Sequence, residues 1–278
     1  MLYVLNYADG QPYQKFQQYC NFSAKFIGKA DSVISFNKDD IPQSYKDAHQ
    51  DIFSYERGGG LWLWKPYLVN KALLSLEKGD WLFYTDSGSI FINDIHLLID
   101  FCIKKETDIM LFDQPLLNRQ FCKCETFKQI GVDDNNETQT LGIFLLKKTK
   151  FTISFMQEWL HYCEQETVIS PKHFFSDIPE FNDFHAHRED QAILSLLGIK
   201  YSLPRFRDCS DYGLFPFQYK NPKWTYVPKE YDFDDYPTIL LCSRKTHPIK
   251  YLFFYYIKKY LNKLGLYTEK YMDKKFQV

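Results

Sequence analysis

The 278-residue chain is long enough for one large domain or two small ones, and its 45% hydrophobic and 25% charged residues exclude an intrinsically disordered protein. A net charge of −1 gives no reason to expect a polyanionic partner for the chain as a whole. Residues 244–278, however, contain nine Lys or Arg and two Asp or Glu, so a segment of charge +7 follows a body of charge −8, and this asymmetry indicates an anionic surface as the partner of the basic segment.

The first half of the chain alternates between short apolar runs and stretches with helical spacing. Leu2–Asn6 and Ser32–Phe36 predict strands. Gln14–Ile27 predicts a helix between them, because its apolar residues recur every three or four positions. After three consecutive glycines, residues 66–76 predict a helix whose first residue, a proline, suits a first helical turn. Trp81–Thr85 then predicts a central strand.

The second half continues this alternation, apart from residues 167–184, which show no periodicity and predict a loop. Its predicted elements are a helix over Asp94–Lys104, strands over Asp108–Phe112 and Thr140–Leu146, helices over 151–160 and 188–198, and a terminal helix from Pro248. Strands that alternate with helices of roughly ten to fifteen residues predict an α/β fold with a mainly parallel central sheet. We therefore expect one domain over residues 1–247 and an amphipathic helical appendage over 248–278.

The cysteines and the N-terminus indicate a cytoplasmic protein. The seven cysteines form no C-x-x-C pair, and an odd number without such pairs is typical of a reduced protein. The opening "MLYVLNYADG" has no basic region and no long apolar run, so it does not predict a signal peptide. The longest strongly apolar stretch, Tyr251–Ile257, is too short to span a bilayer.

Two acids follow predicted strands, where parallel sheets bind their ligands. Asp9 comes shortly after the first strand, and Asp86 stands in "TDSG" directly after the central one. An acid before Ser-Gly is often only a turn. The functional alternative is that Asp86 holds a divalent cation bound to a diphosphate, because hard cations take oxygen ligands.

A second candidate site is "HREDQAILSLL", residues 187–197. Glu189, Asp190 and Gln191 stand at the start of a predicted helix, where negative charge is favoured by the helix dipole. Ordinary helix capping explains them as well as function does. In the functional interpretation, Asp190 and Gln191 face the hydroxyl groups of a sugar.

A third candidate is "SRKTHP", residues 243–248, which follows the apolar run "TILLC". Arg244 and Lys245 could hold phosphate oxygens, and His247 could hold a metal ion. Taken alone, a solvated basic turn is the simpler interpretation.

Together these segments resemble a family of bacterial capsular and O-antigen polysaccharide glycosyltransferases. "RGGGLWLWKPYLVNKALLSLEKGDWLFYTDSG", residues 57–88, is similar to the family signature R-G-x-G-Y-W-x-W-K-P, a helix and G-D-x-x-x-Y-x-D-S-G. "HREDQAILSLL" is similar to a downstream H-R-x-D-Q-S-x-L-S-x-L element, and "YVLNYAD" to the opening strand. The resemblance covers most of residues 1–200 and fades beyond Tyr201.

The resemblance implies a Rossmann-like fold of the A type and transfer of a hexose, with galactose one candidate, from a nucleoside diphosphate sugar such as a UDP-sugar. The acceptor it implies is a hydroxyl of a glycan or of a lipid-linked oligosaccharide in surface polysaccharide synthesis. The expected donor-binding residues are Asp9, Arg57, Trp64, Lys65, Asp86, Ser87, Gly88, His187, Arg188, Arg244 and Lys245. Of Trp62 and Trp64, which are bulky enough to wall a nucleotide pocket, we expect one to belong to the core.

The resemblance also implies a divalent metal, Mn²⁺ or Mg²⁺. Asp86 matches the first Asp of the Asp-x-Asp motif of such enzymes, but Gly88 stands where the second would be. This departure puts a two-carboxylate metal site in doubt. The expected ligands are therefore Asp86 and His247, together with diphosphate oxygens and water.

Two mechanisms and a non-catalytic alternative remain open. If the enzyme inverts, Asp190 or Glu189 would be the general base that removes the acceptor proton. If it retains, the Asp190-Gln191 pair orients the donor sugar, and we favour this interpretation. A non-catalytic module that binds a nucleotide-sugar or a glycan is the alternative, because the missing second Asp can mark a lost activity.

The basic C-terminal segment has two interpretations. Residues 249–278 combine aromatic side chains with lysines, as do helices that lie in the membrane interface. This predicts a peripheral position on the inner face of the plasma membrane. Equally, the helix could pack on the catalytic domain with its lysines outward. Nucleic acid is not expected as a partner, because no nucleic-acid-binding module is recognisable.

Overall fold

The computed structural model describes residues 1–231, 235–244 and 246–275, without the side chains of the last two of these residues. Lys245, expected to bind the donor, lies outside the described residues.

The described chain is built on a six-stranded sheet with the strand order β2-β1-β3-β6-β5-β7. Its strands are β1 (Leu2–Tyr7), β2 (Ser32–Phe36), β3 (Trp81–Tyr84), β5 (Ile109–Leu117), β6 (Thr138–Lys147) and β7 (Arg205–Phe206). β1 pairs in parallel with β2 and β3, and β5 with β7, whereas β6 runs antiparallel to both β3 and β5. The predicted α/β fold with a mainly parallel sheet is therefore confirmed.

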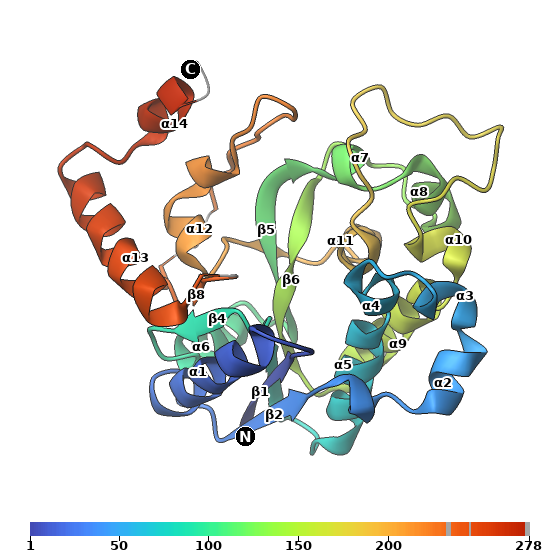
Figure 1. Ribbon diagram of the computed structural model, residues 1–278, viewed down its shortest axis with the longest axis horizontal. Helices are drawn as coiled ribbons and strands as arrows, with labels where there is room; N and C mark the ends of the chain where they lie inside the picture. The colour runs from blue at the N-terminus through green and yellow to red at the C-terminus, as the bar shows by residue number, and fades with distance from the viewer. Residues whose placement is uncertain (232–234, 245, 276–278) are drawn as a thin grey trace.

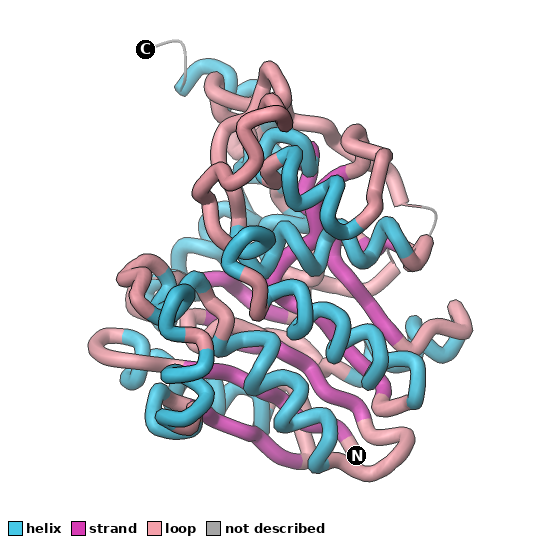
Figure 2. The backbone as a smooth tube through the Cα atoms, turned by 90° about the vertical axis from the view of Figure 1, so that its right-hand side faces the viewer, coloured by secondary structure: helices cyan, strands magenta, loops and turns pink. Residues whose placement is uncertain are grey.

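Alternation along the strands divides the core into two layers, because successive side chains of a strand point to opposite faces of the sheet. On one face, Val4 of β1 and Phe83 of β3 belong to a cluster with residues of α1 (Tyr13–Phe26) and α6 (His96–Lys104). On the other face, Leu5 and Tyr84 pack with residues of α5 (Trp64–Ser75), α9 (Lys150–Cys163) and α11 (Glu189–Lys200). Figure 1 shows these two groups of helices on either side of the sheet, and Figure 2 shows the strands between helical layers.

Several elements differ from the sequence-based prediction. The helix predicted from Pro66 begins two residues earlier, at Trp64, and β5 extends five residues past the predicted end at Phe112. The remaining short helices are η1 (Lys38–Asp40), α2 (Gln43–Ala48), α3 (Gln50–Phe53), α4 (Gly58–Leu61), α7 (Asn118–Phe121), α8 (Cys124–Ile130), α10 (Glu166–Ile169), α12 (Asp211–Leu214) and η2 (Pro216–Tyr219). The predicted loop over 167–184 contains the end of α10 and otherwise no helix or strand.

A small second sheet connects the centre of the molecule to its C-terminal part. β4 (Ser89–Phe91) pairs antiparallel with β8 (Leu240–Cys242), so the chain leaving β3 lies directly against the segment that precedes the last helices. This pairing brings the sequence motifs around residues 86 and 244 into contact.

The C-terminal segment forms α13 (Pro248–Lys263) and α14 (Glu269–Lys275). Tyr255 of α13 belongs to a buried cluster with Phe215, Phe217 and Leu241, and Leu252 packs against the same cluster. The helix thus packs on the rest of the molecule by one face. The division of the chain at residue 248 into a domain and an appendage stays a prediction. None of the helices in the described ranges has both the length and the apolarity needed to cross a bilayer.

Candidate functional site

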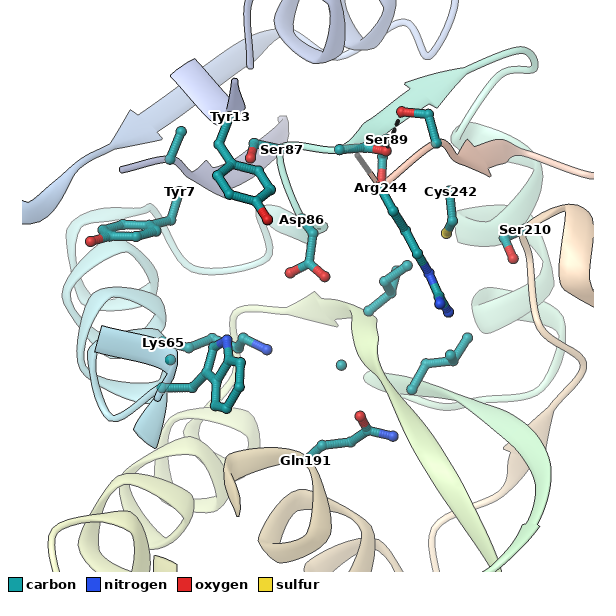
Figure 3. Close-up of a pocket in the computed structure, with 18 of the residues that line it drawn as sticks. Tyr7, Tyr13, Lys65, Asp86, Ser87, Ser89, Gln191, Ser210, Cys242 and Arg244 are labelled. Carbon is teal, nitrogen blue, oxygen red and sulfur yellow. Dashed lines mark hydrogen bonds between the residues drawn. The ribbon is translucent and has the colours of Figure 1, made fainter. Parts of the chain in front are cut away.

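A cavity of about 1020 Å³ lies beyond the carboxyl ends of β1 and β3 (Figure 3). Sequence motifs from distant parts of the chain meet there. Eight of the expected site residues line it: Asp9, Trp64, Lys65, Asp86, Ser87, Gly88, Gln191 and Arg244. Six described residues from the same prediction are not among its lining residues: Arg57, His187, Arg188, Glu189, Asp190 and His247.

Asp86 projects into this cavity. It is the one exposed residue between Trp81 and Phe91, where all its neighbours are buried in the sheet and the turn. Its carboxylate lies in the middle of the site in Figure 3 and accepts a hydrogen bond from the Tyr84 hydroxyl at 3.3 Å. A carboxylate in this position at a strand end is available to a ligand.

Lys65 and Asp190 form a buried ion pair in the wall of the cavity. The Nζ atom of Lys65 lies 2.9 Å from Oδ2 of Asp190, and both side chains are less than a tenth exposed. Burial acts to lower the pKa of Lys65, but the carboxylates of Asp190 and Asp86 outweigh it and raise the pKa above its ordinary value. Lys65 is therefore a cation that lines the cavity, and the Asp190 carboxylate lies behind it.

Gln191, the next residue of α11, faces the cavity. Its side-chain amide nitrogen donates to the Thr140 carbonyl at 2.7 Å and to Oε1 of Gln114, another lining residue, at 3.2 Å. These bonds hold the amide group at the cavity wall (Figure 3).

Glu189 and Arg57 form a second ion pair, at 2.6 Å between Glu189 Oε1 and Arg57 Nε. The Glu189 carboxylate is buried, whereas the Arg57 side chain is 56% exposed and lies over the Trp62 ring. The guanidinium expected to counter a diphosphate is thus occupied by a carboxylate of the chain itself.

The side chains of His187 and Arg188 form hydrogen bonds with other parts of the chain rather than lining the cavity. His187 is fully buried: its Nδ1 accepts a hydrogen bond from the backbone N–H of Lys123, and its Nε2 lies 3.1 Å from the Val168 carbonyl. Burial lowers the pKa of this histidine to about 3, so the ring is neutral and donates through Nε2. The Arg188 guanidinium donates to Gln114 at 2.6 Å, and so it contacts the cavity through that residue.

The backbone of residues 243–244 crosses the turn after β3 at Gly88. A Cβ atom at this position would lie 2.9 Å from the Arg244 carbonyl oxygen and 3.0 Å from its Cα. The Gly88 carbonyl accepts hydrogen bonds from the Arg244 N–H and the Ser243 hydroxyl. An Asp at position 88 therefore does not fit this arrangement, because its side chain would require the crossing segment to move.

Arg244 brings a second cation to the cavity. Its guanidinium lies 5.2 Å from the centre of the Tyr212 ring, and Figure 3 shows the side chain extending along the wall opposite Lys65. The two cations lie on either side of the space into which the Asp86 carboxylate points (Figure 3). Their placement suits a ligand that carries several negative charges.

His247, the second expected metal ligand, is not among the residues that line the cavity. Its Nε2 is 3.4 Å from the Tyr19 hydroxyl, and its ring packs edge-on against Tyr19 and Phe16 of α1. In the part of the chain that the structure describes, no three or more His, Cys, Asp or Glu side chains are grouped to hold a metal ion. A metal ion at Asp86 would therefore need most of its ligands from the bound molecule and from water.

Aromatic residues form the cavity wall at the end of β1. The rings of Tyr7 and Trp64 stack with centroids 3.8 Å apart, and Tyr13 and Trp62 also line the cavity. Trp64 also belongs to a core cluster, so one of the two tryptophans is part of the core, as expected, and it lines the cavity as well. Gly58 is required at this wall, since a Cβ at this position, which has a φ of +64°, would lie 2.3 Å from the Trp62 ring.

The sequence did not predict most of the cavity wall that faces the aromatic wall at the end of β1. It is formed by Gln114 and by residues of the segment after Tyr201, namely Ser210, Tyr212, Tyr219, Cys242, Ser243, Thr246 and Tyr251. Tyr7 was missed as well, although its place at the end of the first strand is a signal that could have identified it. Ser243 and Thr246 lie within the 243–248 motif that the sequence singled out for its charged residues. Ser210, Tyr212 and Tyr219 offered no such signal, because the described part of the segment from 202 to 239 is largely irregular.

Comparisons with known proteins yield structural likenesses only. No protein-family model and no curated protein matches the chain. Among solved structures, it is similar to the apo form of mouse xyloside xylosyltransferase 1 (11% identity, TM-score 0.44, covering 87% of this chain and 97% of that one). It is also similar to the galactosyltransferase LgtC in complex with donor and acceptor sugar analogues (13%, 0.42, 87% and 87%). A third is the apo form of the glycosyltransferase GlyE of Streptococcus pneumoniae (14%, 0.40, 86% and 54%). All three are glycosyltransferases, but likenesses of this size identify neither a reaction nor a substrate.

Proposed function

We propose that this protein is a glycosyltransferase that moves a hexose from a nucleoside diphosphate sugar, with UDP as the preferred nucleotide, to a hydroxyl of a glycan or lipid-linked oligosaccharide. The observation that carries the proposal is the Asp86 carboxylate, which projects from a strand end into a cavity flanked by two cations, Lys65 and Arg244. A carboxylate between two cations suits a diphosphate bound together with a divalent metal.

The size and lining of the cavity support a nucleotide-sugar. Its volume of about 1020 Å³ lies at the top of the range of roughly 300–1,000 Å³ typical of small-molecule pockets. This leaves room for a donor and for the end of an acceptor. The stacked pair of Tyr7 and Trp64 offers an aromatic surface of the kind on which bases and sugar rings pack.

In this proposal Asp86 would hold a divalent metal, Mn²⁺ or Mg²⁺, together with the oxygens of the diphosphate. Mg²⁺ in phosphate-binding sites is commonly held by one or two carboxylates, phosphate oxygens and water, and a single carboxylate at Asp86 meets that minimum. Once bound, such an ion stabilises negative charge on the departing diphosphate. Lys65 and Arg244 act on the same charge from the protein side.

The ion pairs at the start of α11 favour retention over inversion. An inverting enzyme needs an available carboxylate as general base, but Glu189 and Asp190 are both engaged, by Arg57 and Lys65. In our proposal Asp190 holds Lys65 in place, and the neighbouring Gln191 amide, which lines the cavity, orients the donor sugar. The acceptor proton is then taken by the departing diphosphate rather than by a side chain.

A thermal-shift screen of nucleoside diphosphates and their sugars, with and without Mn²⁺, tests the proposal. Ligand that binds only the folded state raises the melting temperature. We expect one nucleoside diphosphate sugar to raise it in a metal-dependent way, and the same mixture to release free nucleoside diphosphate over time. Stabilisation without any release would instead establish a non-catalytic nucleotide-sugar-binding module.

A further inference from the structure

Helix α13 presents a continuous apolar stripe to the outside of the molecule. The stripe consists of Ile249, Phe253, Tyr256 and Tyr260 of the helix and its C-cap residue Leu264, which are between 54% and 65% exposed. Their spacing of three or four residues places them on one side of the helix. Figure 1 shows α13 at the edge of the molecule, with one long side turned away from the sheet.

The stripe is not the face by which α13 is attached. The helix packs on the domain through other residues, Leu252 and Tyr255, and the Tyr251 hydroxyl donates to Asp211 at 2.6 Å. The packing of α13 on the domain is therefore complete without Phe253 or Tyr260. Large exposed apolar surface that the fold does not use indicates a partner.

Lysines border the stripe on both sides. At 3.6 residues per turn, Lys250 falls on one border of the stripe and Lys259 and Lys263 fall on the other. All three are exposed, and the sequence of α13, Pro248–Lys263, contains no Asp or Glu. The combination of an aromatic stripe with flanking cations is complementary to a surface that is apolar inside and anionic outside.

We propose that this stripe docks on an anionic phospholipid bilayer, with α13 lying in the headgroup region. Phe253, Tyr256 and Tyr260 enter the interface, and the flanking lysines reach the phosphate groups. A second copy of this chain is a poorer occupant, because pairing two such helices would bring two sets of lysines together without acids to neutralise them.

Docking in this orientation places the cavity close to the membrane. Tyr251, on the inner face of α13, and Thr246, just before the helix, line the cavity. The membrane-facing stripe is thus separated from the cavity wall by the thickness of one helix, roughly 10 Å. If the proposed function holds, this position suits an acceptor hydroxyl carried by a lipid.

Vesicle flotation with the purified full-length chain tests the proposal. We expect the wild type to float with vesicles of phosphatidylcholine and phosphatidylglycerol, and much less with phosphatidylcholine alone. The double variant Phe253→Glu/Tyr260→Glu should stay unbound, since two charges in the stripe oppose insertion. Leu74→Glu is the matched control: it places a charge at an exposed apolar position of α5, on the other face of the sheet, and should float like the wild type.

The lysines give a second, graded readout. Replacing Lys250, Lys259 or Lys263 with Gln should lower the vesicle partition coefficient about fivefold per lysine, because each near-surface lysine contributes about 1 kcal/mol to the attraction by anionic lipid. Binding should also weaken as salt is raised.

Two results would overturn the proposal. One is equal flotation of the wild type and Phe253→Glu/Tyr260→Glu, or no flotation of either. The other is sedimentation of the wild type as a dimer that the double variant converts to a monomer, which would assign the stripe to a second copy of the chain. Nucleoside diphosphate release from a donor without vesicles should be the same in both proteins, so a failure of the docking proposal is distinguishable from a failure of the proposed function.

Discussion

The end of β3 and the start of α11 both present carboxylates to the same part of the molecule, but in different states. Asp86 is exposed and projects into the cavity, whereas Asp190 and Glu189 are buried and paired with Lys65 and Arg57. The difference shows that a carboxylate close to a site can either contact a ligand or position another side chain. Burial and pairing decide between these roles.

The largest expected effect separates these roles directly. Asp86→Asn removes the carboxylate charge that, in our proposal, binds the metal ion of the metal–diphosphate complex. We expect donor turnover to fall about 1,000-fold. The melting temperature should change little, because the Asp86 side chain accepts only a long hydrogen bond from Tyr84 among the described residues. Steady-state release of nucleoside diphosphate measures the effect, with Asp47→Asn, an exposed acid of α2, as the control. Near-normal turnover of Asp86→Asn would remove the assigned role.

The second expected effect is on stability. Asp190→Asn leaves Lys65 as a buried cation without its partner, and we expect the free energy of unfolding to fall by about 3 kcal/mol. The double variant Lys65→Met/Asp190→Leu should recover most of this loss, because it removes both charges. Urea denaturation measures each value.

Glu189→Gln provides the comparison for that experiment. It leaves the Arg57 guanidinium without its partner, but that side chain is 56% exposed and stays solvated, so we expect a loss closer to 1 kcal/mol. If Asp190→Asn is as stable as the wild type, the Lys65–Asp190 pair does not hold the wall of the cavity together.

The pH dependence of stability tests the role of His187. Its pKa falls from 6.5 to about 3 in the folded protein, so the neutral ring contributes stability that is present above about pH 6.5 and lost as the pH falls toward 3. Between about pH 7.5 and pH 5 the loss should be about 2 kcal/mol. His187→Gln should flatten this dependence, whereas His96→Gln, at an exposed position, should leave it unchanged. Identical profiles for all three proteins would mean that His187 is not buried as described.

The smallest expected effect concerns the turn after β3. Gly88→Ala forces a Cβ atom against the Arg244 backbone, and we expect a loss of about 1 kcal/mol in the free energy of unfolding. Urea denaturation measures this loss. A Gly88→Ala variant as stable as the wild type would show that the 243–244 segment can move aside.

The sequence predicted the parts of the site that depend on local pattern. The apolar run before Asp86 predicts a strand, and an acid directly after such a strand lies at the ligand edge of the sheet. The pairing of Asp190 with Lys65 was not predictable in this way, because the two residues come from helices far apart in the chain. The same applies to Arg57, whose partner Glu189 follows 132 positions later.

The fold shows the same limit. Alternating strands and helices predicted a mainly parallel sheet, but the reversed direction of β6 depends on the connection between β5 and β6, which the apolar run of β6 does not reveal. The tyrosines of the far cavity wall lie in a segment without periodicity. Tyr212 and Tyr219 belong to the segment before β8, and the pairing of β8 with β4 places this part of the chain beside the end of β3.

A crystal structure of the protein with a nucleoside diphosphate sugar and Mn²⁺ tests the central claim most directly. We predict that the diphosphate lies between Lys65 and Arg244, with a metal ion bound to a carboxylate oxygen of Asp86. A donor bound elsewhere, or Asp86 turned away from the bound diphosphate, would contradict this account.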